Sequence, residues 1–585
     1  MSETKPSSFS AWFWAGLILT AFKLWLTRAQ PVYAIGGAAH DDRLFLLMAE
    51  SIIKGEWLGA YNQMTLAKGP FYSLWIAGLY WVGIPLGLGV QLAYAGACAL
   101  FTRACRPALR SGAVLLAIYA FLLWNPMSYE APTMGRVIRQ QIYTPLELAV
   151  LAGLVALYCR RESSGRRQLP WAALLGLSFG CFWLTREEGV WLVPSVLLLT
   201  GAALFWAFRE SWVHGRTLLK SLGLALTFGL LPLTLVSWQN YRHYGWFGTV
   251  EFHAAEFQDA YGAMVRVKIG PDLAYIPVTR QAREAMYAVS PTFAKLQPFL
   301  EGDYGRGWAE AGEYMTKLPP AERQIGSGWL MWALRDTVAA AGFCHNAREA
   351  ISFYRHMAAE INQACDDGRL PARSRRSGFL PVWHKGQTAE LTRTFFTFFD
   401  FVASYNSFSV LPPLSSGDDP ELQLFRDVTR DQLSPSERAT NLRLPNQEAL
   451  NAVKLGLLQS IGLKLRPVLL VLFIVSGMVA LVRVGQVIKT RRLTYPLVLA
   501  AAAFGGFVGY LLLNALVQVT SFSVTAVSTF WPLYPLLQIF TVAVAWDASA
   551  GWLGRPPSGL ADRLSPAAGA ETGPPTGNPS EKTSD

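Results

Sequence analysis

Charged residues are scarce in this chain of 585 residues. Asp, Glu, Lys and Arg together make up 16% of it, against about 25% in soluble globular domains. Six cysteines are present, with no CxxC pair and no Cys/His spacing typical of a metal site, so neither a disulfide framework nor a zinc module organises the fold. The sequence also lacks internal repeats, a P-loop and a GxGxxG turn, and therefore gives no support to the common nucleotide-binding folds.

Apolar residues, in contrast, are abundant and gathered in long runs. The residue types AVILMFWYC make up 52% of the chain, and Trp alone numbers 21. Long apolar runs are typical of a membrane protein with many spans. The net charge of +11 then reflects Lys and Arg gathered in cytoplasmic loops, and the basic residues do not interleave with aromatic ones as in nucleic-acid-binding surfaces. We therefore expect an all-α polytopic membrane protein that binds no nucleic acid.

Ten membrane-spanning helices are predicted, at about residues 11–26, 86–102, 111–125, 143–158, 169–185, 190–208, 221–238, 463–482, 494–516 and 527–546. A further apolar segment at 71–83 reaches only about 20 Å as a helix, against about 30 Å of hydrocarbon, so we expect it to be re-entrant or interfacial. A secretory signal peptide is the alternative for the first run. We favour an uncleaved first span, because many spans follow.

Four basic clusters determine the expected topology. They lie in the loops at about residues 103–110, 160–167, 209–220 and 483–492. With ten spans and both termini in the cytoplasm, all four clusters face the cytoplasm, as the positive-inside rule requires. The opposite side then receives residues 27–85, 126–142, 186–189, 239–462 and 517–526. The expected location is a bacterial inner membrane, with these loops on the periplasmic or extracytoplasmic face.

This topology divides the chain into four parts. Residues 1–238 are expected to form a transmembrane module of about seven spans, and residues 463–546 to form three more. Between them, residues 239–462 are long enough for an outer domain with its own core, expected to be α-rich and to include helices at about 329–340 and 347–364. The tail at 553–585 is rich in Pro, Gly, Ser and Ala and is expected to be a disordered cytoplasmic segment.

An acidic pair in the first outer loop is the main candidate for chemistry. His40, Asp41 and Asp42 precede an amphipathic helix expected over 43–54, which would lie along the membrane surface. The two acids can simply cap that helix, since Asp favours N-cap and first-turn positions. Alternatively, one carboxylate is a general base, because two adjacent acids raise one pKa toward the working range. His40 is then a candidate for the substrate pocket.

Lys68 stands at the entrance of the short apolar segment and is a candidate anion ligand. It follows Tyr61 and Asn62, two further pocket candidates, and precedes Gly69-Pro70, which fits a tight turn before a helix. The alternative is an ordinary interfacial lysine whose aliphatic stem lies along apolar surface.

Arginines on the outer side are unexpected under the positive-inside rule and therefore need a negatively charged partner. Arg136 and Arg139 lie three residues apart, on one helical face. They suit the oxygens of a phosphate, or else an ion pair with Glu130 or Glu147.

Charged residues also occupy the ends of two predicted spans. Arg186, Glu187 and Glu188 lie between two spans with almost no loop. Charges so close to the bilayer usually line a polar cavity, and a self-paired turn is the alternative. Arg242 and His243 end the seventh span, where they are pocket candidates or hydrogen-bonded interfacial residues.

These features occur in an order that resembles the GT-C superfamily of membrane glycosyltransferases. The branch with protein O-mannosyltransferases and the lipid A aminoarabinose transferase is similar at Asp41-Asp42, Gly55-Glu56-Trp57, Lys68-Gly69-Pro70 and Thr185-Arg186. The resemblance covers about residues 10–240. The chain departs from the family pattern in an acid pair without Glu and in the glycine between Lys68 and Pro70.

The resemblance implies inverting transfer of a sugar from a polyprenyl-phosphate donor to an envelope glycan, lipid or protein. Asp41 or Asp42 would take the proton of the acceptor hydroxyl. The cations that would stabilise the departing lipid phosphate are Lys68, Arg136, Arg139 and Arg186. We expect no cofactor and no essential metal, since the sequence has no spaced Asp-x-Asp pair.

A transporter or lipid flippase of envelope precursors is the alternative class. Such proteins tend to show repeated halves and charges near the membrane midplane. Here the ionisable residues lie near span ends, and the two hydrophobic blocks are unequal. A membrane scaffold for envelope assembly is a third hypothesis, in which the acidic pair is only a helix cap.

Overall fold

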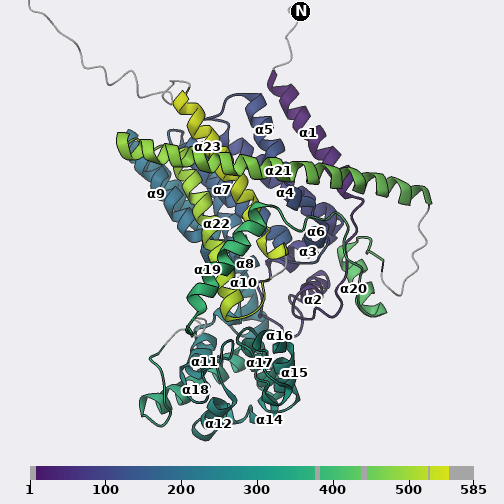
Figure 1. Cartoon of the computed structure of the whole chain (residues 1–585), viewed down its shortest axis with the longest axis vertical. Helices are drawn as coiled ribbons and strands as arrows, with labels where there is room; N and C mark the ends of the chain where they lie inside the picture. Colours follow the sequence, from purple (N-terminus) through teal and green to yellow (C-terminus); the bar gives the residue numbers. More distant parts are fainter. Residues whose placement is uncertain (1–7, 376–381, 436–444, 525–526, 553–585) are drawn as a thin grey trace, which may run out of the picture.

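The structure is a computed structural model that describes residues 8–375, 382–435, 445–524 and 527–552. Within these ranges the chain is helical, without strands and with four isolated bridge pairs, so the all-α prediction is confirmed. The predicted tail at 553–585 lies outside the described residues. A bundle of long helices forms one part of the molecule, and a group of shorter helices, α11 to α18, forms the other (Figure 1).

Each of the ten predicted spans overlaps one of the helices of the bundle. These are α1 (Ser8–Thr27), α4 (Leu86–Cys105), α5 (Gly112–Leu123), α7 (Gln140–Cys159), α8 (Gly165–Thr185), α9 (Val193–Glu210), α10 (Trp212–Tyr244), α21 (Pro445–Thr490), α22 (Tyr495–Thr520) and α23 (Leu533–Trp552). Seven helical segments in the described ranges are long and apolar enough to cross a membrane. The predicted spans on α1, α5 and α8 are outside these seven, so the count of ten is not confirmed.

The bundle is held together by close packing between neighbours in the chain and between its two ends. α8 packs against α7 and α10, α4 against α7, and α22 against α9 and α23. α21 lies across the other helices (Figure 1) and contacts α1 and α23. The C-terminal helices therefore complete a bundle that begins with the N-terminal ones.

Two short helices follow α1 in the first outer loop, where the sequence predicts interfacial segments. α2 (Asp42–Ile53) and α3 (Phe71–Trp81) pack against each other, and α2 also contacts α20 (Asp419–Thr429). Leu44, Phe45 and Met48 of α2 are buried. Much of the apolar face of this amphipathic helix therefore packs against protein, while Leu47 remains exposed.

The outer helices enclose a second hydrophobic core, which includes Phe257, Met264, Leu334, Met357 and Ile361. Its main helices are α11 (Ala255–Arg266), α12 (Arg280–Val289), α15 (Asp303–Ala311), α17 (Ser327–Ala340) and α18 (Ala347–Asp366). The helices expected at 329–340 and 347–364 lie within α17 and α18. The later helix α19 (Gln387–Ala403) instead packs against α22.

Single-turn helices make up the remaining helical segments. They are η1 (Pro126–Tyr129), α6 (Ala131–Met134), η2 (Gly189–Leu192), η3 (Glu251–His253), α13 (Pro291–Ala294), α14 (Gln297–Leu300), α16 (Glu313–Thr316), η4 (Pro320–Glu322) and η5 (Val527–Phe530).

The segment before the acidic pair is held by a distant part of the chain. The Gly36 N–H donates to the Ser416 carbonyl at 2.8 Å, and the Val32 N–H donates to the Gln432 carbonyl at 3.0 Å. A third bond joins the Tyr33 N–H to the Gly135 carbonyl at 2.9 Å. Residues that follow α18 in the chain thus help to hold the segment that leads to His40, Asp41 and Asp42.

A buried ion pair joins the outer domain to the first outer loop. Arg335 of α17 pairs with Glu251 and also donates to the carbonyls of Gln63 and Thr65, at 2.7 and 2.8 Å. The Tyr61 hydroxyl donates to the same Glu251 carboxylate. Because these charges are buried and mutually satisfied, they hold α17 in place beside the residues that lead to Lys68.

Candidate functional site

A cavity of about 690 Å³ lies between the helix bundle and the outer domain. Eight of the residues singled out from the sequence line it: His40, Asp41, Lys68, Arg136, Arg139, Arg186, Glu187 and Glu188. The lining also includes Phe45, Ala67, Ile138, Gln140 and Val190, and further residues from 252–277, 327–332, 382–387, 510–524 and 528–529. The cavity thus collects loops that the sequence topology assigns to one side of the membrane, together with the adjoining ends of three predicted spans.

Asp41 and Lys68 form an ion pair in the wall of this cavity. Asp41 is the N-cap residue of α2, but its side chain makes no capping hydrogen bond, so helix capping does not explain its carboxylate. The Asp41 side chain is 49% exposed to the cavity, whereas that of Lys68 is only 11% exposed. The Lys68 ammonium lies 5.4 Å from the ring centre of Phe45 and 5.8 Å from that of Trp332.

The pair shifts the acid–base properties of both groups. Enclosure by protein raises the pKa of the Asp41 carboxyl, but the adjacent Lys68 ammonium outweighs it and holds that pKa below its usual value. Burial lowers the pKa of the Lys68 ammonium, although Asp41 opposes this shift. Asp41 is therefore ionised at neutral pH and able to accept a proton.

Asp42 has a different environment from its neighbour. Its carboxylate is fully buried and accepts two hydrogen bonds from Arg136 Nε at 3.1 Å and one from Nη2 at 2.9 Å. Burial raises the pKa of the Asp42 carboxyl to about 6, although Arg136 opposes the rise. Asp42 is not among the lining residues. The structure therefore separates the acidic pair into one carboxylate that faces the cavity and one that holds Arg136.

Glu187 connects Arg139 with the turn that carries Lys68. Its carboxylate accepts hydrogen bonds from Arg139 at 2.6 and 2.7 Å and from the Gly69 N–H at 3.0 Å. Arg139 also donates to the Thr185 carbonyl at 3.1 Å. Because all partners are fixed by backbone or helix positions, Glu187 positions both cations at the cavity wall.

The glycine between Lys68 and Pro70, which departs from the family pattern, is explained by close packing. A Cβ atom on Gly69 would lie 2.1 Å from the Leu184 carbonyl oxygen at the end of α8. The turn therefore lies directly against the α8 backbone, where only glycine fits.

Gly69→Ala is expected to reduce activity by displacing this turn. The added methyl group must move the backbone away from Leu184, and with it the Lys68 ammonium and the Glu187 hydrogen bond. A displacement of about 1 Å in such a site costs about 10²-fold in rate, which a turnover assay of the purified variant measures. Gly78→Ala in α3 is the matched control, since a Cβ there meets nothing within 4 Å. Wild-type turnover of Gly69→Ala would contradict this role of the turn.

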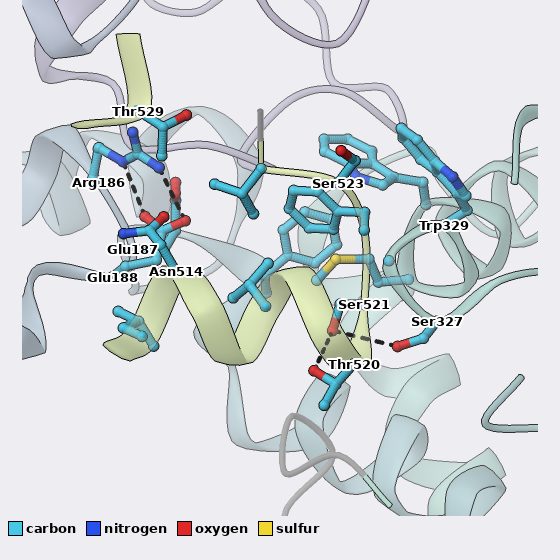
Figure 2. Close-up of a pocket in the computed structure, with 18 of the residues that line it drawn as sticks. Arg186, Glu187, Glu188, Ser327, Trp329, Asn514, Thr520, Ser521, Ser523 and Thr529 are labelled. Atoms are coloured by element: carbon cyan, nitrogen blue, oxygen red, sulfur yellow. Dashed lines mark hydrogen bonds and ion pairs between the residues drawn. The ribbon is translucent and has the colours of Figure 1, made fainter. Parts of the chain in front are cut away.

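Arg186 and Glu188 form the self-paired turn that was the alternative from the sequence. Arg186 Nε and Nη2 donate to Glu188 at 3.1 and 3.2 Å, and the Arg186 guanidinium lies 5.8 Å from the ring centre of Tyr143. Figure 2 shows this pair beside Asn514 and Thr529. Arg186 opposes the effect of burial and lowers the pKa of the Glu188 carboxyl to about 2. The pair nevertheless lines the cavity.

Four predicted pocket residues are not brought to the cavity. Tyr61 binds Glu251, and Asn62 accepts hydrogen bonds from the Met64 and Thr65 N–H groups of its own turn. Arg242 lies 4.9 Å over the Trp238 ring, and His243 stacks on Trp57 with ring centres 6.4 Å apart. These contacts lie away from the cavity lining.

Sequence reasoning missed the lining residues of the outer domain and of the C-terminal helices. Trp329 and Trp332 lie three apart in the predicted helix at 329–340, a spacing that places them on one face, yet this signal is common in cores. Asn514 lies within an apolar span and gave no signal. Among the described residues, no three His, Cys, Asp or Glu side chains gather as metal ligands.

No family model and no curated protein matches the chain. Two solved structures do, both crystal structures of ArnT from Cupriavidus metallidurans, one in the apo state and one bound to undecaprenyl phosphate. Their identities to this chain are 14% and 15%, each match covers 93% of this chain and 78% of that chain, and the TM-score is 0.31 in both.

Proposed function

We propose that the protein is a membrane glycosyltransferase that moves a sugar from a polyprenyl-phosphate donor to a hydroxyl group of a cell-envelope acceptor. One observation carries the proposal: the ionised Asp41 faces a cavity of about 690 Å³ whose wall also holds Lys68, Arg136, Arg139 and Arg186. A base and several cations around one space suit a reaction in which a hydroxyl loses its proton while a phosphate departs.

In the proposed step, the acceptor oxygen forms a bond to the anomeric carbon as the bond from that carbon to the phosphate oxygen breaks. The acceptor proton goes to the Asp41 carboxylate, and the bonding electron pair leaves with the polyprenyl phosphate. A single displacement of this kind inverts the anomeric centre. Lys68 stabilises the negative charge that develops on the leaving phosphate.

The cations of the cavity are not equally available to a phosphate. Arg136 is engaged by Asp42, Arg139 by Glu187 and Arg186 by Glu188. Lys68 is paired with Asp41, which is itself half exposed to the cavity, so an incoming phosphate can compete for this ammonium. We therefore assign the direct phosphate contact to Lys68 and an electrostatic role to the three arginines.

An apolar part of the lining suits the lipid tail of such a donor. Val190 follows the charged turn, and Leu513 and Val517 lie on α22, one of the helices apolar enough to cross a membrane. A polyprenyl chain can leave the cavity along these side chains while its phosphate stays near Lys68. In this proposal the reaction takes place at the outer leaflet of a bacterial inner membrane.

A transfer assay tests the proposal against transport. The purified chain in lipid nanodiscs is supplied with radiolabelled polyprenyl-phosphate hexoses and pentoses. We expect release of polyprenyl phosphate and a labelled glycosidic product when envelope extract supplies the acceptor. In proteoliposomes, movement of labelled lipid across the bilayer with no glycosidic product would overturn the proposal in favour of a flippase.

The pH dependence of the reaction is expected to differ between free protein and donor complex. In the free protein Lys68 holds the pKa of Asp41 below its usual value, so kcat/KM is expected to stay level down to about pH 4. Once the donor phosphate engages Lys68, Arg139 and Arg136 oppose the effect of burial only in part, and the Asp41 pKa rises. The acidic limb of kcat is therefore expected at higher pH than that of kcat/KM. If the acidic limbs of kcat and kcat/KM coincide in profiles measured from pH 4 to 8, the donor phosphate does not compete with Asp41 for Lys68.

A further inference from the structure

The cavity has two chemically different ends. The charged side chains described above lie at one end, beside α2, α7 and the 186–188 turn. The other end is formed by residues 327–332 of α17 and by residues 520–524 after α22. In Figure 2, Arg186, Glu187 and Glu188 lie apart from Ser327, Trp329 and Ser521. Among the described residues of these two segments, no Asp, Glu, Lys or Arg lines the cavity.

An aromatic wall leads from the proposed base to this uncharged end. Trp332 lies 4.8 Å from the His40 ring centre and under the Lys68 ammonium. One turn earlier on the same face of α17, Trp329 stacks on Trp308 with ring centres 5.7 Å apart and lies 6.4 Å from Phe522. Neighbouring indole groups thus extend from Asp41 and Lys68 to the far end.

Uncharged polar groups accompany these rings. The hydroxyls of Ser327 and Ser521 lie 3.5 Å apart, at the limit of a hydrogen bond, and the Thr520 hydroxyl lies 3.2 Å from that of Ser521. The far end therefore offers several hydroxyls beside flat aromatic surface.

At this end of the cavity, a backbone segment of the outer domain lies directly against one of the helix bundle. The Gly328 N–H donates to the Ser521 carbonyl at 3.4 Å. A Cβ atom on Gly328 would lie 2.4 Å from the Phe522 ring. Glycine thus lets the first turn of α17 lie against the segment after α22, and the outer domain supplies the wall that the bundle lacks.

We propose that this end of the cavity binds an uncharged sugar unit of the acceptor, which makes the acceptor a glycan. The inference rests on the proposed function, because it places this sugar so that one of its hydroxyls, or that of the next unit, reaches Asp41 past Trp332. The C–H face of a pyranose ring packs on the Trp329 indole, and its hydroxyls bond to Ser327 and Ser521. These two segments carry no cation that could bind a phosphorylated lipid headgroup. The flat indole surface favours the face of a sugar ring over a peptide.

Saturation-transfer NMR on the full-length chain in nanodiscs tests this sugar site. The probes are maltotetraose, chitotetraose and a mannotetraose as neutral glycans, with glucosamine 1-phosphate and a Ser/Thr-rich octapeptide as competitors. We expect saturation transfer to at least one neutral tetrasaccharide, and Trp329→Ala is expected to weaken its binding about tenfold. Trp212→Ala is the matched control, because this exposed tryptophan starts α10 and does not line the cavity.

Two further measurements separate sugar binding from folding and from catalysis. Trp329→Phe keeps the aromatic face but removes the N–H, and is expected to weaken binding less than Trp329→Ala at an unchanged melting temperature. In transfer assays, Trp329→Ala is expected to raise the acceptor KM about tenfold while the affinity for polyprenyl phosphate stays that of the wild type.

The outcomes distinguish this inference from the proposed function. If polyprenyl phosphate binds but no neutral tetrasaccharide does, or if Trp329→Ala binds them as the wild type does, the sugar site is wrong and the proposed function stands. Preferred binding of the octapeptide or of glucosamine 1-phosphate likewise overturns it. If neutral glycans bind through Trp329 but no donor sugar is ever transferred, the sugar site stands and the proposed function is wrong.

Discussion

Asp41→Asn is expected to lower the rate of sugar transfer by about 10²–10⁴-fold, the usual contribution of a positioned general base. Asparagine keeps the size of the side chain but cannot accept the proton. The substitution removes no helix cap, because the Asp41 side chain makes no capping hydrogen bond. Turnover with a labelled donor measures the effect, and the melting temperature of the variant is expected to stay close to that of the wild type.

Two other substitutions on α2 make this test decisive. Glu50→Gln removes a carboxylate that pairs only with Lys54 at the surface, and is expected to leave turnover unchanged. Asp42→Asn leaves the Arg136 guanidinium without its buried partner, so it is expected to destabilise the fold by up to about 3–5 kcal/mol. Wild-type turnover in Asp41→Asn, or a larger catalytic loss in a stably folded Asp42→Asn, would show that Asp41 is not the base.

Lys68→Met is expected to reduce kcat/KM for the donor by about 10²–10³-fold, the usual loss when one preorganised group that stabilises developing charge is removed. Methionine replaces the aliphatic stem between Phe45 and Trp332, so the packing of the site is retained. The donor is expected to be affected more than the acceptor, because the ammonium is assigned to the leaving phosphate.

Kinetics at varied donor and varied acceptor concentration measure this difference. Lys54→Met serves as the control, since Lys54 lies at the end of α2 with its side chain 56% exposed. Equal losses for donor and acceptor would contradict the phosphate assignment. A second consequence is expected in the same variant: without the ammonium, burial raises the Asp41 pKa, so the acidic limb of kcat/KM moves to higher pH.

The membrane part of the fold was the easier part to predict, because long apolar runs determine where helices lie. The runs at 86–102 and 494–516, for example, correspond to α4 and α22. The short segment at 71–83 is an 11-residue helix, α3, as its length requires. The runs on α1, α5 and α8 show the limit of this reasoning. An apolar helix can still be too short, or too low in mean hydropathy, to count among the helices that could cross a membrane.

Residue types and spacing predicted much of the site, but not how its charges pair. Asp41 and Lys68 lie far apart in the chain, and only the packing of α2 against α3 brings them together. Asp42 and Asp41 are neighbours in sequence, yet they point to different partners because the helix starts between them. Tyr61 was predicted for the pocket on its chemistry, whereas Arg335 and Glu251, which no local pattern connects to it, draw it into a buried ion pair.

The aromatic end of the cavity illustrates a second limit. A tryptophan on a helix face indicates a core more often than a ligand site, and only the tertiary structure shows that Trp329 and Trp332 face a cavity. The Gly69 position is the opposite case. The sequence showed a departure from the family pattern there, and the Leu184 carbonyl supplies its physical reason.

The hydrogen bonds from Val32 and Gly36 to Gln432 and Ser416 have a consequence for how the protein matures. A ribosome releases the N-terminal helices long before it makes the residues that hold the loop ahead of Asp41. A nascent or truncated chain that ends after α10 can insert its first spans but lacks the bonds from Gln432 and Ser416 that hold the loop ahead of Asp41. The full set of contacts around this loop is then acquired late in synthesis, once Ser416 and Gln432 have packed against the beginning of the chain.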